Sequence, residues 1–259
     1  MEMKNPIKKT RFHLIDEFRG FLLINMIAFH AIWDLVYILG HNWQWFRSDG
    51  AFIWQQAVCW SFILVSGFCW QMSRHALKRG LLVFGAGIVI TLATLIFMPD
   101  SRVIFGVLTM IGSSMLLMIP CDKLFCKINP YFGAVISFLL FLFVYPVNDG
   151  YFGIGETEMI VLPSELYSSM LSTYLGFPEP GFWSTDYFSV LPWFFLYVTG
   201  YFLYSAYSSI KGSATGENVT QLLSTSICPP LGWMGRNSLI IYMLHQPVVY
   251  GVLVLINSL

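Results

Sequence analysis

Long apolar runs alternate with short polar segments along most of the chain. Seven of them reach or approach the roughly 20 residues that a helix needs to cross about 30 Å of hydrocarbon. They cover residues 18–39, 51–72, 80–97, 103–119, 131–145, 188–207 and 239–255. The pattern predicts an all-α, polytopic transmembrane helical bundle of about seven spans. We expect one domain, residues 1–259, with a long outer loop at 146–187.

Composition supports the membrane assignment. Hydrophobic residues make up 56% of the chain and charged residues only 11%, too much apolar surface for a water-soluble core of this size. The net charge is zero, which argues against a nucleic-acid partner. The five cysteines show no Cys-x-x-Cys spacing, so the sequence predicts neither a disulfide nor a metal site.

The basic residues are distributed by side of the membrane. If the amino terminus is cytoplasmic, every Lys and Arg except Arg47 and Arg102 falls in an inner segment, including Lys4, Lys8 and Lys9. Positively charged residues gather on the cytoplasmic side of membrane proteins. The asymmetry therefore predicts a cytoplasmic amino terminus and an outer carboxyl terminus.

The first apolar run carries ionisable groups that a simple anchor would not. At 100° per helical residue, Arg19, His30, Asp34 and Asp16 share one narrow face. A charge near the bilayer centre costs roughly 2.5 to 3.5 kcal/mol, so such residues usually face a bundle interior and mark a working site. His30 is the candidate general base and Asp34, four residues on, the group that orients it. Packing of a buried histidine against Asp34 is the competing interpretation.

Spacing along this helix suggests a substrate. His30 lies about 16 Å deeper than Arg19, at about 1.5 Å per residue. Coenzyme A thioesters fit such a pair, with phosphates at one end and an acyl group at the tip of a thin arm. Arg74 and Arg79 add phosphate-binding capacity at the inner surface. Ordinary positive-inside charge explains these two arginines equally well.

The last span supplies a second group of polar residues. Ser238, Tyr242 and His245 lie on one helix face, and Pro247 is expected to open the helix there. Packing against the first span would place His30 and His245 in one cavity. Polar contacts that only hold helices together are the alternative.

The outer loop is acidic and aromatic and lacks Lys and Arg. It could receive a polar ligand such as a sugar, or it could be a solvated loop whose aromatic rings rest in the interface. Apolar residues recur at helical intervals over 160–175, which suggests a short surface or re-entrant helix.

Several blocks in order along the chain resemble a known family. The opening Leu14-Ile15-Asp16-Glu17-Phe18-Arg19-Gly20, followed by His30 and Trp33-Asp34, is similar to bacterial relatives of heparan-alpha-glucosaminide N-acetyltransferase. The closing Gly235-Arg236-Asn237-Ser238 and His245-Gln246-Pro247 agree with this. So do the inner blocks Ser66-Gly67, Arg79-Gly80, Ile104-Phe105-Gly106-Val107-Leu108, Asp186-Tyr187-Phe188 and Leu191-Pro192-Trp193.

The resemblance implies a membrane acyltransferase of the bacterial inner membrane. The donor would be acetyl-CoA or another acyl-CoA, and the acceptor a hydroxyl or amine of a cell-envelope carbohydrate. Arg19 and His30 match the motif of the wider transmembrane acyltransferase group. His41 is an alternative catalytic histidine, because the lysosomal relative carries its own in a loop after the first helix.

The residues and the resemblance together suggest further roles. We expect Arg19, Arg74 and Arg79 to bind the CoA phosphates, and Ser238, Tyr242, His245 and Asp186 to line the substrate pocket. The lipid bilayer is a partner, and a homodimer is possible. Two rivals stay open: a proton-coupled transporter without acyl-transfer activity, and a haem or quinone protein that uses His30 and His245.

Overall fold

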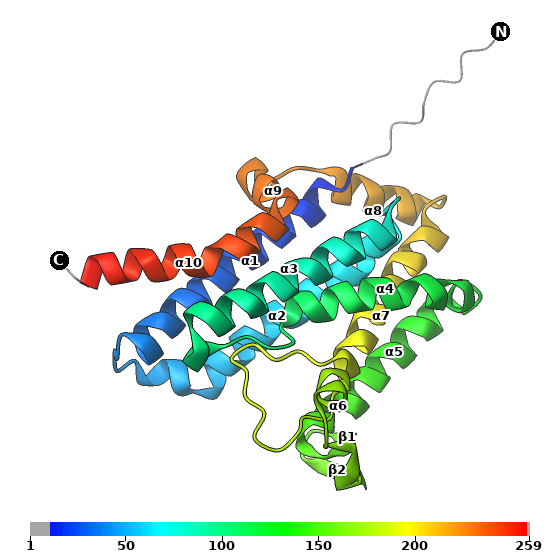
Figure 1. The fold of residues 1–259 in the computed structure, drawn as a ribbon. Helices are drawn as coiled ribbons and strands as arrows, with labels where there is room; N and C mark the ends of the chain where they lie inside the picture. The colour runs from blue at the N-terminus through cyan, green and yellow to red at the C-terminus, as the bar shows by residue number, and fades with distance from the viewer. Residues whose placement is uncertain (1–10, 258–259) are drawn as a thin grey trace. The chain divides into compact units, whose positions relative to one another are not determined.

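The fold is that of a computed structural model, of which residues 11–257 are described, so Lys4, Lys8 and Lys9 lie outside the described residues. It is 75% helical. The chain folds into two compact units, residues 11–58 with 207–257 and residues 59–206, and each is described by itself (Figure 1). The prediction of one domain stays a prediction.

A helix forms in every predicted span. The helices that correspond to the seven apolar runs are α1 (His13–Trp33), α2 (Asp49–Trp70), α3 (Ala76–Phe97), α4 (Val107–Phe125), α5 (Pro130–Val144), α7 (Val190–Ile210) and α10 (Ser238–Asn257). Within the described residues, six segments are long and apolar enough to cross a membrane, and α7 is not among them. The mainly helical, membrane-spanning fold is confirmed, whereas the count of seven and the orientation stay predictions.

The first unit is built around α1. After Trp33 the helix widens into the π-helical turn η1 (Asp34–Ile38), and a short 3-10 turn, η2 (Gln44–Arg47), leads to α2. The unit is completed by α8 (Ala214–Ser224), α9 (Pro229–Arg236) and α10. α1 contacts α9 and α10, and Figure 1 shows α10 running beside α1 before its carboxyl-terminal turns extend away.

Glycines let α1 and α9 approach backbone to backbone. A Cβ at Gly20 would collide with the carbonyl oxygen of Leu231, and one at Gly235 would collide with that of Asp16. Small residues allow this close approach in membrane helices, where apolar lipid leaves little other drive for association. Because Gly20 and Gly235 have no side chain, α9 can lie directly against the amino-terminal half of α1.

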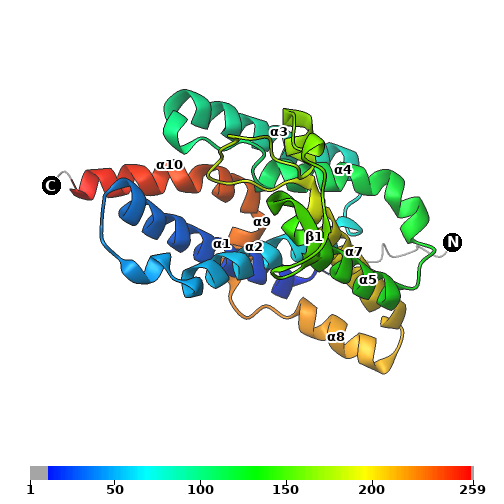
Figure 2. The ribbon, with the colours of Figure 1, turned by 90° about the horizontal axis from the view of Figure 1, so that it is seen from below.

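The second unit uses the same device. A Cβ at Gly87 would meet Thr109, and one at Gly112 would meet the backbone of Phe84, so α3 and α4 lie in close contact. The most deeply buried side chains of this unit include Tyr197, Tyr201, Phe141, Ile63, Met110 and Met118. Figure 2 shows α3 and α4 side by side from a second direction.

The outer segment of the second unit departs from the expected helix over 160–175. It forms an antiparallel hairpin of β1 (Tyr151–Ile154) and β2 (Thr157–Val161), between the 3-10 turns η4 (Tyr145–Asp149) and η5 (Ser164–Leu166), and only α6 (Met170–Leu175) is α-helical. Gly155 has a φ of 59°, which a two-residue hairpin turn requires and glycine adopts freely. The mainly helical expectation is confirmed, with this short hairpin as an exception, and the helix suggested over 160–175 forms only at its end, as α6.

Candidate functional site

Polar side chains of α1 meet polar side chains of α10 at three successive levels. The Arg19 guanidinium donates from Nη2 to Oγ of Ser238 at 2.6 Å. The rings of His30 and His245 lie 4.9 Å apart between centroids. Further along, Nε2 of Gln246 donates to Oδ1 of Asp34 at 2.7 Å. These six residues, which we call the α1–α10 stack, form a polar seam between two apolar helices.

The stack follows from helical spacing. Arg19, His30 and Asp34 lie on one face of α1, as the sequence predicted, and that face contacts α10. Asp16 shares the face but pairs instead with Arg11, whose Nε lies 3.0 Å from Oδ2. Asp34 is also the first residue of the π-helical turn. Such turns occur frequently at functional sites, because they disturb the regular hydrogen-bond ladder.

Burial and hydrogen bonding are unequal along the stack. Asp34 is fully buried, with an exposed fraction of 0%, and His245 is 9% exposed. Three side-chain atoms there have no hydrogen-bond partner among the described residues: Oδ2 of Asp34, Nε2 of His245 and Oε1 of Gln246. Buried polar groups are normally satisfied, so each exception needs an explanation.

The ring of His245 is held by its own helix. Nδ1 lies 2.5 Å from the carbonyl oxygen of Tyr242, and the rings of the two residues are 5.3 Å apart between centroids. Tyr242 is half-buried and borders His245, and its place in a substrate pocket stays a prediction. Contrary to expectation, α10 continues as a helix through Pro247.

The predicted pairing of His30 with Asp34 does not form. No hydrogen bond joins the two side chains, both of which lie in the described part of the chain; Asp34 binds Gln246 instead. The physical reason is that the bond to α10 replaces the one within α1. Asp34 therefore links α1 to α10, and its role in orienting the His30 imidazole stays a prediction.

His41 lies in a different environment. It is exposed in the segment that follows η1, with its ring 6.3 Å from that of Trp43. It contributes nothing to the α1–α10 stack. Of the two candidate histidines, His30 is the one that the fold places beside other polar residues.

Arg74, Arg79 and Asp186 belong to the second unit. Both arginines are exposed near the start of α3. Asp186 accepts from the backbone N–H of Val107 at 3.2 Å, so its carboxylate caps the first turn of α4, where a negative charge is favourable. The roles of the arginines in CoA binding and of Asp186 in the substrate pocket stay predictions.

Aromatic residues gather in the outer segment close to Asp186. The rings of Phe105 and Phe182 stack, and Phe182 meets Tyr187 edge to face. The Tyr187 hydroxyl donates to the carbonyl oxygen of Thr173 at 2.5 Å, and burial raises the pKa of Tyr187 to about 12. This hydroxyl thus stays protonated at neutral pH and holds the loop onto α6.

Two polar residues that join α1 to neighbouring segments were not singled out in the sequence. Gln246 is the partner of Asp34. Glu17 is 3% exposed and accepts from Oγ of Ser226 at 2.5 Å and from the N–H of Ile227 at 2.9 Å, just before α9. Both lie inside the sequence blocks named above. A polar residue within an apolar helix is the signal that could have identified them.

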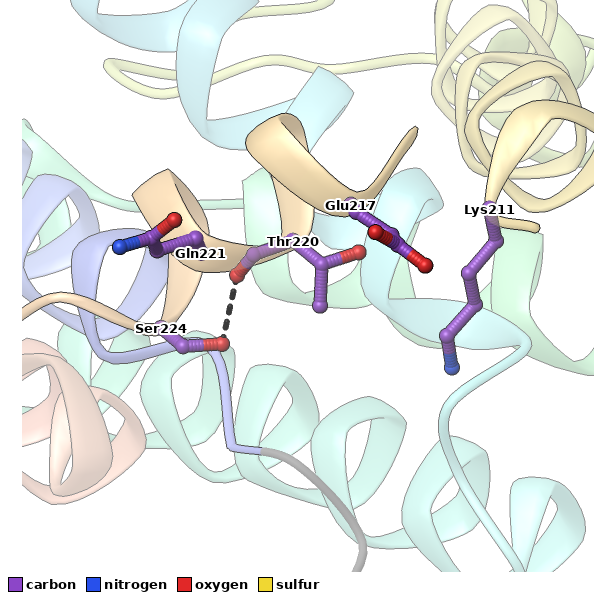
Figure 3. A pocket seen from close by; sticks show the side chains of 5 residues that line it. All are labelled: Lys211, Glu217, Thr220, Gln221 and Ser224. Atoms are coloured by element: carbon purple, nitrogen blue, oxygen red, sulfur yellow. Dashed lines mark hydrogen bonds between the residues drawn. The ribbon is translucent and has the colours of Figure 1, made fainter. Parts of the chain in front are cut away.

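A surface depression lies elsewhere in the first unit. It is lined by Lys211, Glu217, Thr220, Gln221 and Ser224, mostly on α8 (Figure 3). Oγ of Ser224 donates to the carbonyl oxygen of Thr220 at 2.7 Å. None of these residues belongs to the α1–α10 stack. In the described residues, no group of three His, Cys, Asp or Glu side chains is placed to hold a metal ion.

Comparison with known proteins gives a match over almost the whole chain. A family model described as heparan-alpha-glucosaminide N-acetyltransferase, catalytic, matches residues 11–247. The chain belongs to this family. The match of the acetyltransferase family begins just before α1 and ends at Pro247, so it contains all six residues of the stack. Neither a curated protein nor a solved structure matches the chain significantly.

Proposed function

We propose that the protein is a membrane acyltransferase that moves an acyl group, most simply acetyl, from cytoplasmic acyl-CoA to a hydroxyl or amine of a cell-envelope carbohydrate. The α1–α10 stack carries the proposal. It places two histidines, an arginine and a buried carboxylate between apolar helices, in a chain of the acetyltransferase family. Ionisable groups inside a membrane bundle are costly and usually functional.

Arg19 would hold the charged end of the donor. Its guanidinium has five N–H donors in a rigid fork, and only one hydrogen bond from it, to Ser238, is formed within the described residues. The remaining donors are suited to phosphate oxygens. From the sequence alone, Arg74 and Arg79 are proposed to contribute positive charge for CoA phosphates.

His30 would remove the proton from the attacking group. The hydroxyl or amine of the acceptor attacks the thioester carbonyl, its proton passes to the His30 imidazole, and collapse of the tetrahedral intermediate breaks the carbon–sulfur bond. The imidazolium then returns the proton to the leaving thiolate. General base catalysis of this kind contributes about 10²- to 10⁴-fold. His245, whose ring lies 4.9 Å away, lines the pocket with Ser238 and Tyr242.

Purified full-length protein in lipid nanodiscs provides the direct test. Acetyl-CoA binding is measured by calorimetry, and release of the CoA thiol is followed with glucosamine as acceptor. We expect binding and acceptor-dependent thiol release. Mass spectrometry of surface glycans from cells with and without the protein should then show acylated species only in its presence.

A proton-coupled transporter is the competing function. Histidines and a buried aspartate in one seam also suit a proton relay. A transporter would not bind acetyl-CoA or release its thiol. Proton uptake into proteoliposomes driven by a sugar gradient, together with the absence of acetyl-CoA binding, would favour the transporter and contradict the acyltransferase.

A further inference from the structure

The unpartnered oxygen atoms at the Asp34 end of the α1–α10 stack are all hydrogen-bond acceptors. Oδ2 of Asp34 belongs to a carboxylate, and Oε1 of Gln246 to an amide carbonyl. The amide nitrogen of Gln246 faces Oδ1 of Asp34 at 2.7 Å, so its oxygen points elsewhere. Neither oxygen can donate a hydrogen bond.

The free nitrogen of His245, Nε2, is also a hydrogen-bond acceptor. A backbone carbonyl only accepts, so Nδ1, which lies 2.5 Å from the oxygen of Tyr242, carries the proton. In the neutral imidazole, Nε2 is then an acceptor with a free lone pair. This nitrogen is buried and lacks a partner among the described residues.

We infer that Asp34, His245 and Gln246 bind a hydrogen-bond-donating O–H or N–H group of the acyl acceptor. The inference rests on the proposed function and deepens it. Leaving three acceptors unsatisfied inside a membrane helix pair is costly, and a group with several O–H or N–H bonds satisfies them together. The thioester group itself has no such bond, since its carbonyl oxygen and sulfur only accept, and the nearest N–H of the donor lies two carbons beyond the sulfur, on the CoA side.

The site therefore separates the two substrates. Acceptor hydroxyls or amines lie against Asp34, His245 and Gln246, and the nucleophilic atom faces His30, whose ring is 4.9 Å from that of His245. The donor approaches from the Arg19 and Ser238 level. In this arrangement His245, Gln246 and Asp34 determine which acceptor binds and have little influence on acyl-CoA affinity.

Substitutions that remove one acceptor atom test the inference. His245→Asn keeps an N–H for the Tyr242 carbonyl but has no atom in place of Nε2. Gln246→Met keeps the side-chain length but loses Oε1, and with it the N–H that binds Asp34. Asn25→Leu is the matched control, because Asn25 lies on α1 and its amide is satisfied by Phe21 and Trp54.

Thiol release from acetyl-CoA is measured in nanodiscs with glucosamine, with N-acetylglucosamine and with water as the sole acceptor. For His245→Asn and Gln246→Met we expect the KM of the better sugar to rise about tenfold or more, while the KM of acetyl-CoA changes less than about threefold and the control resembles wild type. The two sugars show whether an amine or a hydroxyl is bound.

Each contrary result has a distinct meaning. If wild type turns over a sugar and both variants keep its KM within about twofold, the inference is overturned. A loss confined to the water reaction identifies the bound group as water and also overturns it. A wild-type protein that neither binds acetyl-CoA nor releases thiol contradicts the proposed function itself.

Discussion

The contacts that α1 makes with α9 and with α10 are built on different principles. Against α9, glycine backbones touch, and the buried carboxylate of Glu17 is satisfied by Ser226 and Ile227. Against α10, the contact consists of polar side chains, and three buried acceptor atoms lack partners among the described residues. Close packing with satisfied groups is typical of a structural contact, whereas unsatisfied buried groups are typical of a site that awaits a ligand.

Two carboxylates that look alike in the sequence of this helical segment therefore differ in their surroundings. Glu17 and Asp34 are both buried carboxylates on the same helical segment. Their hydrogen-bond partners differ, and so do the expected results of substitution. Changes at the α9 contact should affect folding first, and changes at the α10 contact should affect turnover first.

The largest expected effect is on activity at the α10 contact. His30→Ala should reduce acyl transfer by about 10²- to 10⁴-fold without loss of membrane insertion, because a general base is removed while apolar packing persists. Thiol release and sugar acylation are measured in nanodiscs. His41→Ala is the control, since His41 is exposed; turnover lost in that variant but kept in His30→Ala would transfer the catalytic role to His41.

Next comes the glycine contact with α9. Gly235→Ala should destabilise the protein by about 1–3 kcal/mol, because the new methyl group overlaps the carbonyl of Asp16. Thermal unfolding in detergent measures the change. Gly251→Ala is matched, since nothing lies within 4 Å of a Cβ at that position of α10. Equal unfolding temperatures for the two variants would refute the close approach.

A smaller loss of stability is expected at Glu17. Glu17→Gln replaces an acceptor-only carboxylate by an amide and weakens its bonds to Ser226 and Ile227. The melting temperature should fall, and kcat per folded molecule should stay at the wild-type value. Glu217→Gln on exposed α8 serves for comparison. A fall in kcat without a fall in melting temperature would move Glu17 into the catalytic site.

The smallest effect is predicted for Ser238→Ala. The bond from Arg19 to Ser238 orients the guanidinium, and the loss of one such bond is worth about 1 kcal/mol, or roughly a fivefold change in binding. We expect a rise of this size in the KM of acetyl-CoA and an unchanged KM for the sugar. A rise in the sugar KM alone would place Ser238 at the acceptor and not at the donor.

Much of the site could be predicted because helical spacing is local. The common face of Arg19, His30 and Asp34 follows from about 100° per residue, and the polar residues of α10 from the same rule. The pairing of Asp34 could not be predicted, because the bond within α1 and the bond to Gln246 compete for one carboxylate. Only the packed helices decide between them.

In the outer segment, local spacing did not predict the secondary structure. Apolar residues at helical intervals suggested a short helix over 160–175, but Ile160 and Val161 end a strand that pairs with Tyr151–Ile154, and only Met170–Leu175 is α-helical. Gly155, with its positive φ, allows the tight turn. Short apolar runs fit both periodicities, so the turn decides the result.

The sequence by itself determined the membrane class, the helical segments and the polar face of α1, because hydropathy and spacing act over neighbouring residues. Tertiary structure alone decided which helix covers that face, which acceptor atoms are left without partners, and that Glu17 supports α9. These depend on contacts between residues about 200 positions apart, such as Glu17 with Ser226 and Asp34 with Gln246, which no local pattern specifies.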